Sequence, residues 1–438
     1  MKVNVIGAGL AGAEAALQLA KRGISVDLYE MRPKKMTGAH KTENFAEFVC
    51  SNSLGAADCS NASGLLKNEM ELLGGVLIPL ARKYSLPAGT ALAVDREGFS
   101  QAVTNLIKNN SYINIINEEV VEIPKGYTIV ASGPLTSDLL ACSIKEFTQE
   151  EHLHFFDAIA PIVEKDSINF DKAFWASRYD KGEASYINCP MNKKEYENFY
   201  NILINAPKIE LKEFEKNAKF FESCLPIEVL ASRGFDTLRF GPMKPVGLVD
   251  KRTGEENYAV VQLRQDNSAK TLFNLVGFQT NLKWPSQKEL LQSIPGLENV
   301  SIVRYGVMHR NTFINSPKVL NSTLQARKRD DLFFAGQLTG TEGYTESIAT
   351  GMLAGINMSR LIMGQKLLQL PKTTMLGALT QYISDESHDK FQPINSNWGI
   401  VEEVELSKKD RKNKKLKAEL ISKRSISVIT KLQTEIEI

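Results

Sequence analysis

Three glycines near the start of the chain have the spacing of a phosphate-binding turn. Gly7, Gly9 and Gly12 form a G-x-G-x-x-G motif between an apolar strand that begins at Val3 and a run of helix-forming residues. In this setting the first glycine permits a tight turn, the second lets the backbone approach a pyrophosphate, and the third lets the helix pack on the sheet. The helix N-terminus adds unpaired N–H groups and a positive dipole end. The motif therefore predicts a dinucleotide site.

Glu30 completes this prediction. It follows the next apolar strand, Ile24 to Tyr29, and lies about 20 residues beyond the glycines, where a carboxylate accepts hydrogen bonds from an adenosine ribose. An acid here fits FAD or NAD better than NADP, because it would repel a 2′-phosphate. The residues that we expect to contact the cofactor in this region are Gly7, Ala8, Gly9, Leu10, Ala11, Gly12 and Glu30.

A second glycine-rich turn, late in the chain, favours FAD over NAD. Gly336 to Gly343 follows a strand at Leu332 to Ala335 and precedes a long helix rich in small residues. FAD is long enough to place its ADP half on the first helix and its flavin at the N-terminus of this one, whose positive end favours the anionic reduced flavin. The residues expected to contact the flavin are Gly336, Gly343, Tyr344 and Ser347.

Two of the five cysteines lie in settings that could support thiolate chemistry. Cys50 is followed by Ser-Asn-Ser in a polar segment, and Cys224 precedes Pro226. A cysteine is a nucleophile only as its thiolate, which needs positive charge or a helix N-terminus nearby. No C-x-x-C pair is present, which argues against a zinc site, a disulfide framework and a dithiol redox pair. The remaining three are interpreted as small buried hydrophobic residues: Cys59, Cys142 and Cys189.

Aromatic and basic residues in the middle of the chain are candidates for binding a substrate. The face of Trp284 can stack on a flat ring. His309 and Arg310 could bind an anion, and Lys244 could contact a phosphate. The basic stretch at 408–424 is either a further phosphate contact or a solvated helix face.

The predicted secondary structure that would position these residues changes along the chain. We expect helices at Leu65 to Leu73 and Asp95 to Asn109, and a strand at Ile113 to Ile116. Residues 31–64 are polar and predict a long loop. From about 155 to 304, short strands, aromatic residues and turn residues predict an antiparallel sheet.

The predicted fold class is α/β: an FAD-binding Rossmann-like domain of the glutathione-reductase type, with an inserted α+β domain built on an antiparallel sheet. The expected limits are 1–154 for the first part of the FAD-binding domain, 155–325 for an inserted substrate or RNA domain, and 326–438 for the second part with its basic tail.

The composition is that of a globular protein without strong overall charge. Hydrophobic residues make up 43% of the 438 residues and charged residues 24%, and the formal net charge is +2. The whole chain is therefore no electrostatic attractor for nucleic acid, although local basic patches remain possible. Because the first strand begins at Val3 and no apolar run reaches about 18 residues, we expect no signal peptide, no membrane span and a cytoplasmic protein. We also expect no metal.

The chain resembles one family of bacterial enzymes over nearly its whole length. The resemblance rests on long segments in matching order: VIGAGLAGAEAA, LYEMRP, FAEFVCSNSL, PAGTALAVDREGFS, ESCLPIEVLASRG, LRFGPMKPVGL, YAVVQLRQDN, FNLVGFQTNLKWPSQ, VRYGVMHRNTFINSP, FFAGQLTGTEGYTES and FQPINSNWG. By these segments the sequence is similar to the folate- and FAD-dependent tRNA (uracil-5-)-methyltransferases.

The resemblance implies an activity, its co-substrates and two catalytic cysteines. Members of the family make 5-methyluridine in the T-loop of tRNA, with methylene-tetrahydrofolate as carbon donor and with FAD that NAD(P)H reduces. By position, Cys224 matches the nucleophile that adds to uracil C6, and Cys50 matches the base that removes the C5 proton. The expected substrate-binding residues are Trp284 for a pterin or a base, His309 and Arg310 for an anion or the folate's glutamate tail, and Lys244 for an RNA phosphate. Arg96 and Arg264 are further candidates for a phosphate or folate contact.

Other functions stay open at this level. Some family members act on a uridine of 23S ribosomal RNA, in organisms whose proteins are rich in Lys, Asn and Ile, as this chain is. A flavin-dependent NAD(P)H oxidoreductase acting on small molecules is a second alternative, and an RNA-binding protein that keeps FAD structurally is a third. The sequence indicates neither the oligomeric state nor the preferred pyridine nucleotide.

Overall fold

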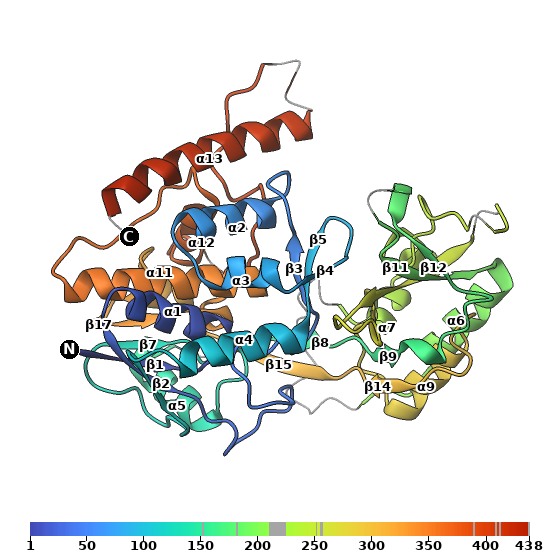
Figure 1. Ribbon diagram of the computed structural model, residues 1–438, viewed down its shortest axis with the longest axis horizontal. Helices are drawn as coiled ribbons and strands as arrows, with labels where there is room; N and C mark the ends of the chain where they lie inside the picture. Colours follow the sequence, from blue (N-terminus) through green and yellow to red (C-terminus); the bar gives the residue numbers. More distant parts are fainter. Residues whose placement is uncertain are drawn as a thin grey trace.

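The chain forms a larger and a smaller lobe, joined by two extended strands (Figure 1). The computed structural model describes residues 1–150, 153–180, 183–209, 225–250, 252–254, 257–388, 390–407, 410 and 413–436. The joining strands, β8 (Leu153–Ala158) and β15 (Met308–Phe313), pair antiparallel. The smaller lobe therefore interrupts the larger one in sequence, as expected for an inserted domain.

The larger lobe is built on a mainly parallel sheet. Six of the described strands are ordered β16-β17-β7-β1-β2-β6, and only β16 runs antiparallel to its neighbour. Both faces of the sheet are covered, so the central strands carry buried apolar residues on each side, such as Val5 and Ile6 in β1. The strands are β1 (Lys2–Ile6), β2 (Ser25–Tyr29), β6 (Ile113–Ile116), β7 (Thr128–Val130), β16 (Gln325–Ala326) and β17 (Arg329–Phe334).

Two glycine-containing helices cross closely above this sheet. Helix α1 (Leu10–Lys21) packs against α11 (Tyr344–Ile362). A Cβ atom at Gly351 would lie 2.2 Å from the carbonyl oxygen of Ala11, so the close approach requires glycine there. The other helices of this lobe are α2 (Ala62–Leu72), α3 (Leu77–Lys83), α4 (Arg96–Lys108), α5 (Asp138–Thr148), α10 (Ser316–Val319), α12 (Met375–Ile383) and the short η5 (Gln337–Thr339).

The predicted loop at 31–64 is more ordered than expected. It contains β3 (Ser53–Ala56), which pairs with β5 (Ala91–Val94), and β5 pairs in turn with β4 (Ser85–Leu86). The prediction of a strand-free loop was wrong here because the four residues of β3 carry no alternating pattern, and their pairing partner lies far along the chain. The predicted helices and the strand at 113–116 are confirmed within a few residues.

The smaller lobe has an antiparallel sheet with helices on one face. Six described strands are ordered β10-β11-β12-β13-β9-β14. Apolar side chains of one sheet face, among them Ile187, Val261 and Leu263, form a core with the helices. The elements are β9 (Ile162–Glu164), η1 (Lys165–Ser167), β10 (Phe174–Ala176), η2 (Arg178–Asp180), β11 (Tyr186–Met191), α6 (Lys193–Asn205), α7 (Ile227–Ser232), α8 (Thr237–Phe240), β12 (Ala259–Gln265), β13 (Leu272–Leu275), α9 (Trp284–Gln292) and β14 (Ile302–Arg304). The predicted α/β class with an inserted antiparallel domain is confirmed; its exact limits at 154/155 and 325/326 stay predictions.

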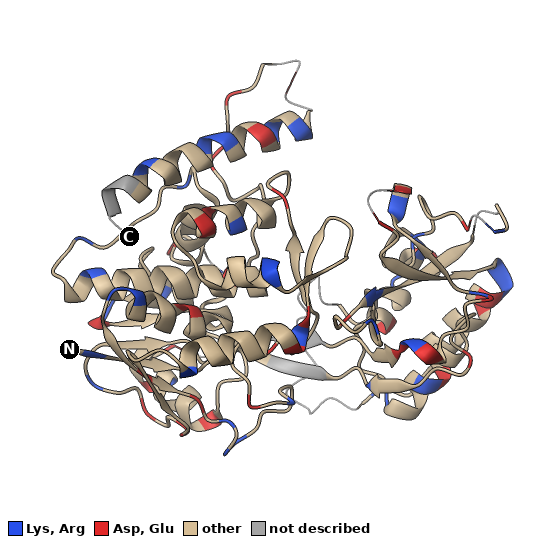
Figure 2. Cartoon of the chain, in the orientation of Figure 1, with Lys and Arg blue, Asp and Glu red and all other residues tan. Residues whose placement is uncertain are grey.

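The basic C-terminal segment includes the start of helix α13 (Lys414–Ile436), which packs on α2. Ile421 and Ile429 are buried, and Ser422 Oγ donates to the carbonyl oxygen of Cys59 at 2.8 Å. Lys and Arg are spread along the helix (Figure 2). One face of α13 is therefore part of the core, and RNA contact by its basic residues stays a prediction.

Candidate functional site

The glycine turn after β1 leaves open space at only one of its three glycines. Gly7 has a φ of +96°, and a Cβ atom at Gly12 would lie 1.8 Å from the carbonyl oxygen of Gly7. Both positions are thus required by the fold. A Cβ atom at Gly9, the N-cap of α1, would meet nothing within 4 Å. The backbone at Gly9 is open to a ligand, as the pyrophosphate-binding role requires.

Glu30 lies beside this turn and is held by two neighbours. Its carboxylate accepts hydrogen bonds from the backbone N–H of Ala8 at 3.0 Å and from Arg32 Nε at 3.0 Å. Burial acts to raise the pKa of Glu30, but the hydrogen bonds and charge of Arg32 outweigh it and leave the pKa below its ordinary value. Glu30 is therefore an ionised acceptor at the end of β2.

A single long cavity joins the two glycine-rich turns. It extends from the end of β2 past the N-terminus of α1 to the N-terminus of α11. Of the residues predicted to contact a cofactor, those that line it are Gly7, Gly9, Leu10, Ala11, Glu30, Gly336, Tyr344 and Ser347. The other three, Ala8, Gly12 and Gly343, shape the turns without being among its lining residues. An elongated dinucleotide fits this arrangement.

Cys50 lies half-buried near the α11 end of the cavity. Its backbone N–H donates to Tyr344 Oη at 2.6 Å, and its carbonyl oxygen accepts from Arg96 Nη2 at 3.2 Å. Arg96 also pairs with Asp266, Nη2 to Oδ1, at 2.9 Å. Arg304 Nη2 donates to the carbonyl oxygen of Val49 at 2.7 Å. Residues from both lobes thus fix the backbone that carries this thiol.

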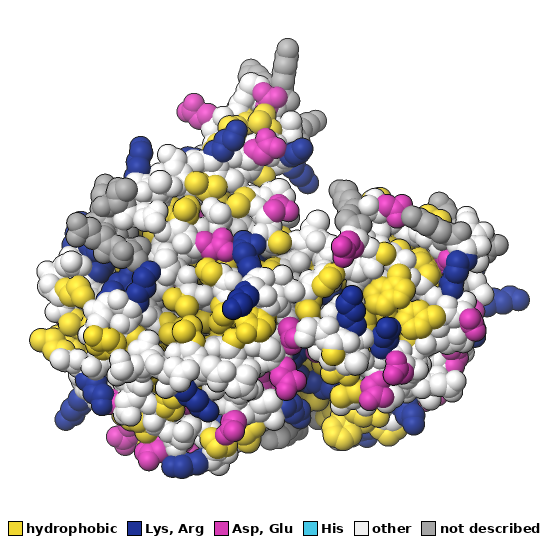
Figure 3. Space-filling model, viewed as in Figure 1, with side chains coloured by type: hydrophobic (Ala, Val, Ile, Leu, Met, Phe, Trp, Pro, Cys, Tyr) yellow, Lys and Arg dark blue, Asp and Glu magenta, His cyan; other side chains and the backbone are white. Residues whose placement is uncertain are grey.

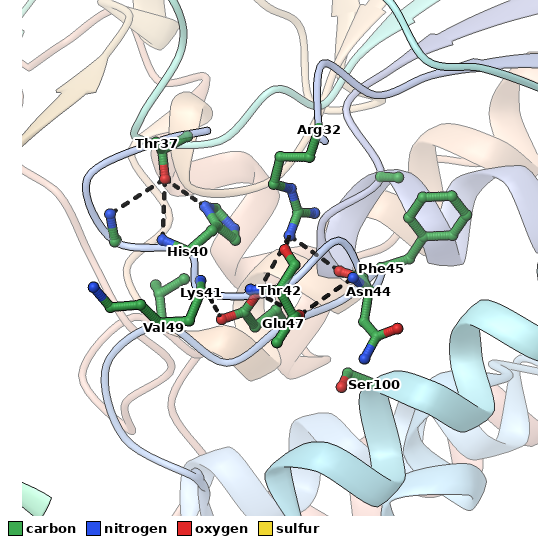
Figure 4. Close-up of polar contacts among 12 residues, drawn as sticks. Arg32, Thr37, His40, Lys41, Thr42, Asn44, Phe45, Glu47, Val49 and Ser100 are labelled. Atoms are coloured by element: carbon green, nitrogen blue, oxygen red, sulfur yellow. Dashed lines mark hydrogen bonds and ion pairs between the residues drawn. The ribbon is translucent and has the colours of Figure 1, made fainter. Parts of the chain in front are cut away.

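The segment before Cys50 is organised by a buried charge pair (Figure 4). Arg32 Nη1 donates to Glu47 Oε2 at 3.3 Å and to the carbonyl oxygens of Thr42 and Asn44. Glu47 accepts in turn from the backbone N–H groups of Lys41 and Thr42, at 2.9 and 3.0 Å. Through Arg32, the acid Glu30 and the cysteine segment belong to one network.

His40 lies in the same segment and lines the cavity. Its Nδ1 shares a hydrogen bond of 2.6 Å with Thr37 Oγ1. Burial, aided by the charge of Arg32, lowers the pKa of His40 to about 4, so the ring is neutral at pH 7. Sequence reasoning missed the roles of His40, Arg32 and Glu47, although Arg32 lies in the LYEMRP segment and Glu47 in FAEFVCSNSL.

Comparisons with known proteins agree with this geometry. The family model described as "Glucose inhibited division protein A" matches residues 2–366. A protein of Bacillus velezensis named methylenetetrahydrofolate–tRNA-(uracil-5-)-methyltransferase TrmFO is 58% identical over 427 residues, 98% of this chain and 97% of its own length. Proteins of the same name from Bacillus subtilis and Brevibacillus brevis are 57% and 56% identical, over 98% and 99% of this chain and 97% and 98% of their own lengths.

The chain belongs to the GidA family, and within it to the TrmFO proteins.

A solved structure shows the fold of this family. The GidA protein of Aquifex aeolicus, in its form II crystal, superposes with a TM-score of 0.71 at 18% identity. The match covers 99% of this chain and 73% of that one. At that identity the likeness concerns the fold alone, and it agrees with the two-lobed architecture described above.

The second cysteine expected from the TrmFO resemblance cannot be placed. Cys224 lies outside the described residues; the described chain resumes at Leu225, just before α7. Among the other thiols, Cys189 is buried as expected, whereas Cys142 is exposed, so the expectation of a buried residue was wrong there. Burial raises the pKa of the Cys59 thiol.

The substrate residues expected from the resemblance lie in the smaller lobe and its connection. Trp284 is 57% exposed and stacks on Tyr305, with 5.2 Å between ring centroids and 16° between planes. Lys244 is exposed, and its carbonyl oxygen accepts from Arg178 Nη2 at 3.1 Å. His309 and Arg310 belong to β15, and their side chains lie outside the described part.

Two searches of the described residues found nothing further. No helix there has the length and apolar character to cross a membrane. The same part of the chain holds no cluster of three or more His, Cys, Asp or Glu side chains placed to bind a metal ion.

Proposed function

We propose that this protein methylates C5 of a uridine in tRNA, with methylene-tetrahydrofolate as carbon donor and FAD reduced by NAD(P)H as reductant. The observation that carries the proposal is the identity of 56–58% with TrmFO proteins over nearly the full length of both chains. The T-loop is the expected position in the tRNA. A tRNA substrate also favours a cytoplasmic location.

The cavity fits FAD. The open backbone at Gly9 and the N-terminus of α1 suit the pyrophosphate, and Glu30 suits the ribose. The N-terminus of α11, where Tyr344 and Ser347 line the cavity, suits the flavin. When bound, reduced FAD supplies the electrons that convert the transferred methylene into a methyl group.

The proposed roles of the cysteines follow from the chemistry of uracil. C5 of uracil is a poor nucleophile. When a thiolate adds to C6, the new S–C6 bond displaces the C5=C6 π electrons toward C4 and O4, and the resulting enolate attacks carbon through C5. Covalent addition thus divides one difficult step into two easier ones. By family position Cys224 supplies this thiolate, and Cys50 removes the proton from C5 after the carbon is attached.

The structure supports the role of Cys50 through its position. It lies beside Tyr344 at the end of the cavity assigned to the flavin, and residues from both lobes hold its backbone. The exposed Trp284–Tyr305 stack is a proposed platform for a pterin or a base. Lys244, His309 and Arg310 remain proposed contacts for RNA or folate anions.

Methylation by the purified protein tests the proposal. The protein is incubated with NADPH, methylene-tetrahydrofolate and either unmodified tRNA or ribosomal RNA, and 5-methyluridine is measured by nucleoside chromatography. We expect product in tRNA and a loss of 10²–10⁴-fold in the Cys50→Ser variant. Product in ribosomal RNA alone would contradict the assignment of tRNA as the substrate. Rapid NADPH oxidation with no product in either RNA would favour a small-molecule oxidoreductase.

A further inference from the structure

One face of the smaller lobe's sheet is polar and meets the cysteine segment. In β12 the side chain of Leu263 belongs to the core, so Arg264 points to the opposite face. Arg264 lies directly across from Tyr186 in β11 and from Asn274 in β13. Because directly opposed residues share a sheet face, these three side chains form a row across three strands.

This row lies against the residues that follow Cys50. Asn274 Nδ2 donates to Asn52 Oδ1 at 3.4 Å, and Asn52 Nδ2 donates to the carbonyl oxygen of Gln265 at 3.0 Å. Asp266, just beyond Arg264 in the chain, holds Arg96, which in turn holds the carbonyl oxygen of Cys50. The row of Tyr186, Arg264 and Asn274 thus borders the catalytic segment. The two lobes meet along a recess on the surface (Figure 3).

Arg264 differs from the other arginines in this region because its guanidinium makes no hydrogen bond within the described chain. Its Nε is buried and lacks a partner there. Arg96 and Arg304, by contrast, donate to the carbonyl oxygens of Cys50 and Val49. A buried donor without an acceptor costs about 1–3 kcal/mol, so a guanidinium left in this state is a reason to expect a ligand.

The charges around Arg264 are mixed. Burial lowers the pKa of Arg264, as does the charge of Arg96, whereas the charges of Tyr186, Asp266 and Cys50 act in the opposite direction.

We propose that Arg264 donates a hydrogen bond to O4 of the target uridine and stabilises the enolate that forms there. The inference rests on the proposed function. Cys50 is expected to reach the proton on C5, and C4, which carries O4, is the neighbouring ring atom. Addition of a thiolate to C6 sends the displaced electron pair to O4, so the charge on that oxygen grows during the reaction. A preorganised cation at O4 therefore binds the transition state more strongly than the ground state.

The test compares Arg264→Gln and Arg264→Lys with a control, Arg252→Gln. Arg252 belongs to the same lobe, pairs with Asp250 at 2.8 Å and donates to the carbonyl oxygens of Phe170 and Lys172. We expect Arg264→Gln to lower kcat for tRNA methylation by about 10²–10³-fold, with KM and the Kd for tRNA changed less than about two-fold. Arg264→Lys keeps the charge without the fork geometry and should recover part of this loss. The control should methylate like the wild type.

Three results separate the possibilities. A wild-type protein that never methylates RNA would refute the proposed function, whatever Arg264 does. If wild type is active and both Arg264 variants keep its kcat, the inference is wrong. The inference is also wrong if the variants keep kcat at saturating tRNA but bind tRNA with a weaker Kd. If the slope of log Kd against log salt concentration also falls by about one, Arg264 contacts an RNA phosphate instead. Should Arg264→Gln fail to fold, Arg264→Lys carries the same comparison.

Discussion

Gly9 and Gly12 belong to the same glycine motif, three residues apart, and have different roles. We predict that Gly12→Ala destabilises the apoprotein by more than about 3 kcal/mol, because its Cβ would lie 1.8 Å from a backbone oxygen. Gly9→Ala should change the apoprotein's stability by less than about 0.5 kcal/mol, since nothing lies within 4 Å, yet weaken FAD binding at least about ten-fold. Urea unfolding and flavin fluorescence titration measure the two effects. FAD binding by Gly9→Ala at wild-type affinity would contradict the placement of the pyrophosphate.

Tyr344 positions Cys50 through a hydrogen bond that the sequence could not reveal, because the two residues lie far apart in the chain. Tyr344→Phe removes the acceptor of the Cys50 N–H. We expect a fall in stability of about 1 kcal/mol and a fall in methylation of about ten-fold, with FAD still bound. Tyr112→Phe, at an exposed tyrosine, is the matched control. If Tyr344→Phe and Tyr112→Phe methylate equally well, Tyr344 does not position Cys50.

Residues with local signals were predictable, and residues with distant partners were not. The glycine spacing and Glu30 were visible because the turn, the helix and the acid lie within one short segment. Arg32 and Glu47 carry no such signal, because their importance depends on which groups the fold brings next to them.

At the level of elements, the strands and helices with clear periodicity were predicted within a few residues. The missed strand β3 is short, and its pairing with β5 across more than 30 residues gives it no local pattern. The inserted sheet was predicted from its short apolar runs, aromatic residues and turn residues. The register that aligns Tyr186, Arg264 and Asn274 was not predicted. Register follows from packing of the whole lobe.

Glu69 connects three helices of the larger lobe and makes stability depend on pH. It lies on α2 and accepts from the backbone N–H groups of Met375 and Leu376 at the start of α12, at 2.7 and 2.8 Å, and from Ser425 Oγ of α13. Burial raises the pKa of Glu69 to about 7. Between its ordinary pKa and pH 7 the folded state therefore binds the proton that the unfolded state releases.

The sign of the effect follows from this difference in proton binding. The contribution of Glu69 to stability is fully present below its unfolded pKa and is lost as pH rises through about 7. We predict that the stability of wild type relative to Glu69→Gln falls by roughly 3 kcal/mol between pH 4.5 and 8, at 1.36 kcal/mol per pKa unit. Denaturant unfolding at several pH values measures it. A difference that stays constant with pH would show that folding leaves the pKa of Glu69 unchanged.

At the scale of the whole molecule, the proposed site lies where the two lobes meet. The larger lobe supplies the cavity and Cys50, and the smaller lobe supplies Asp266 and Asn274, together with Arg264 in the proposed role. The two domains could be predicted from the sequence, because one has alternating strands and helices and the other has mostly short strands separated by turns. Their contact surface could not, because it depends on side chains that are brought together only by the complete fold.

The origin of the methyl carbon is the most direct test of the whole account. Unmodified tRNA, NADPH and the purified protein are incubated with methylene-tetrahydrofolate labelled with ¹³C in the methylene group, and the 5-methyluridine is analysed by mass spectrometry. In a parallel reaction, the label is in the methyl group of S-adenosylmethionine instead. The account predicts ¹³C in 5-methyluridine from the folate and none from S-adenosylmethionine. Unlabelled product, or label from S-adenosylmethionine alone, would contradict it.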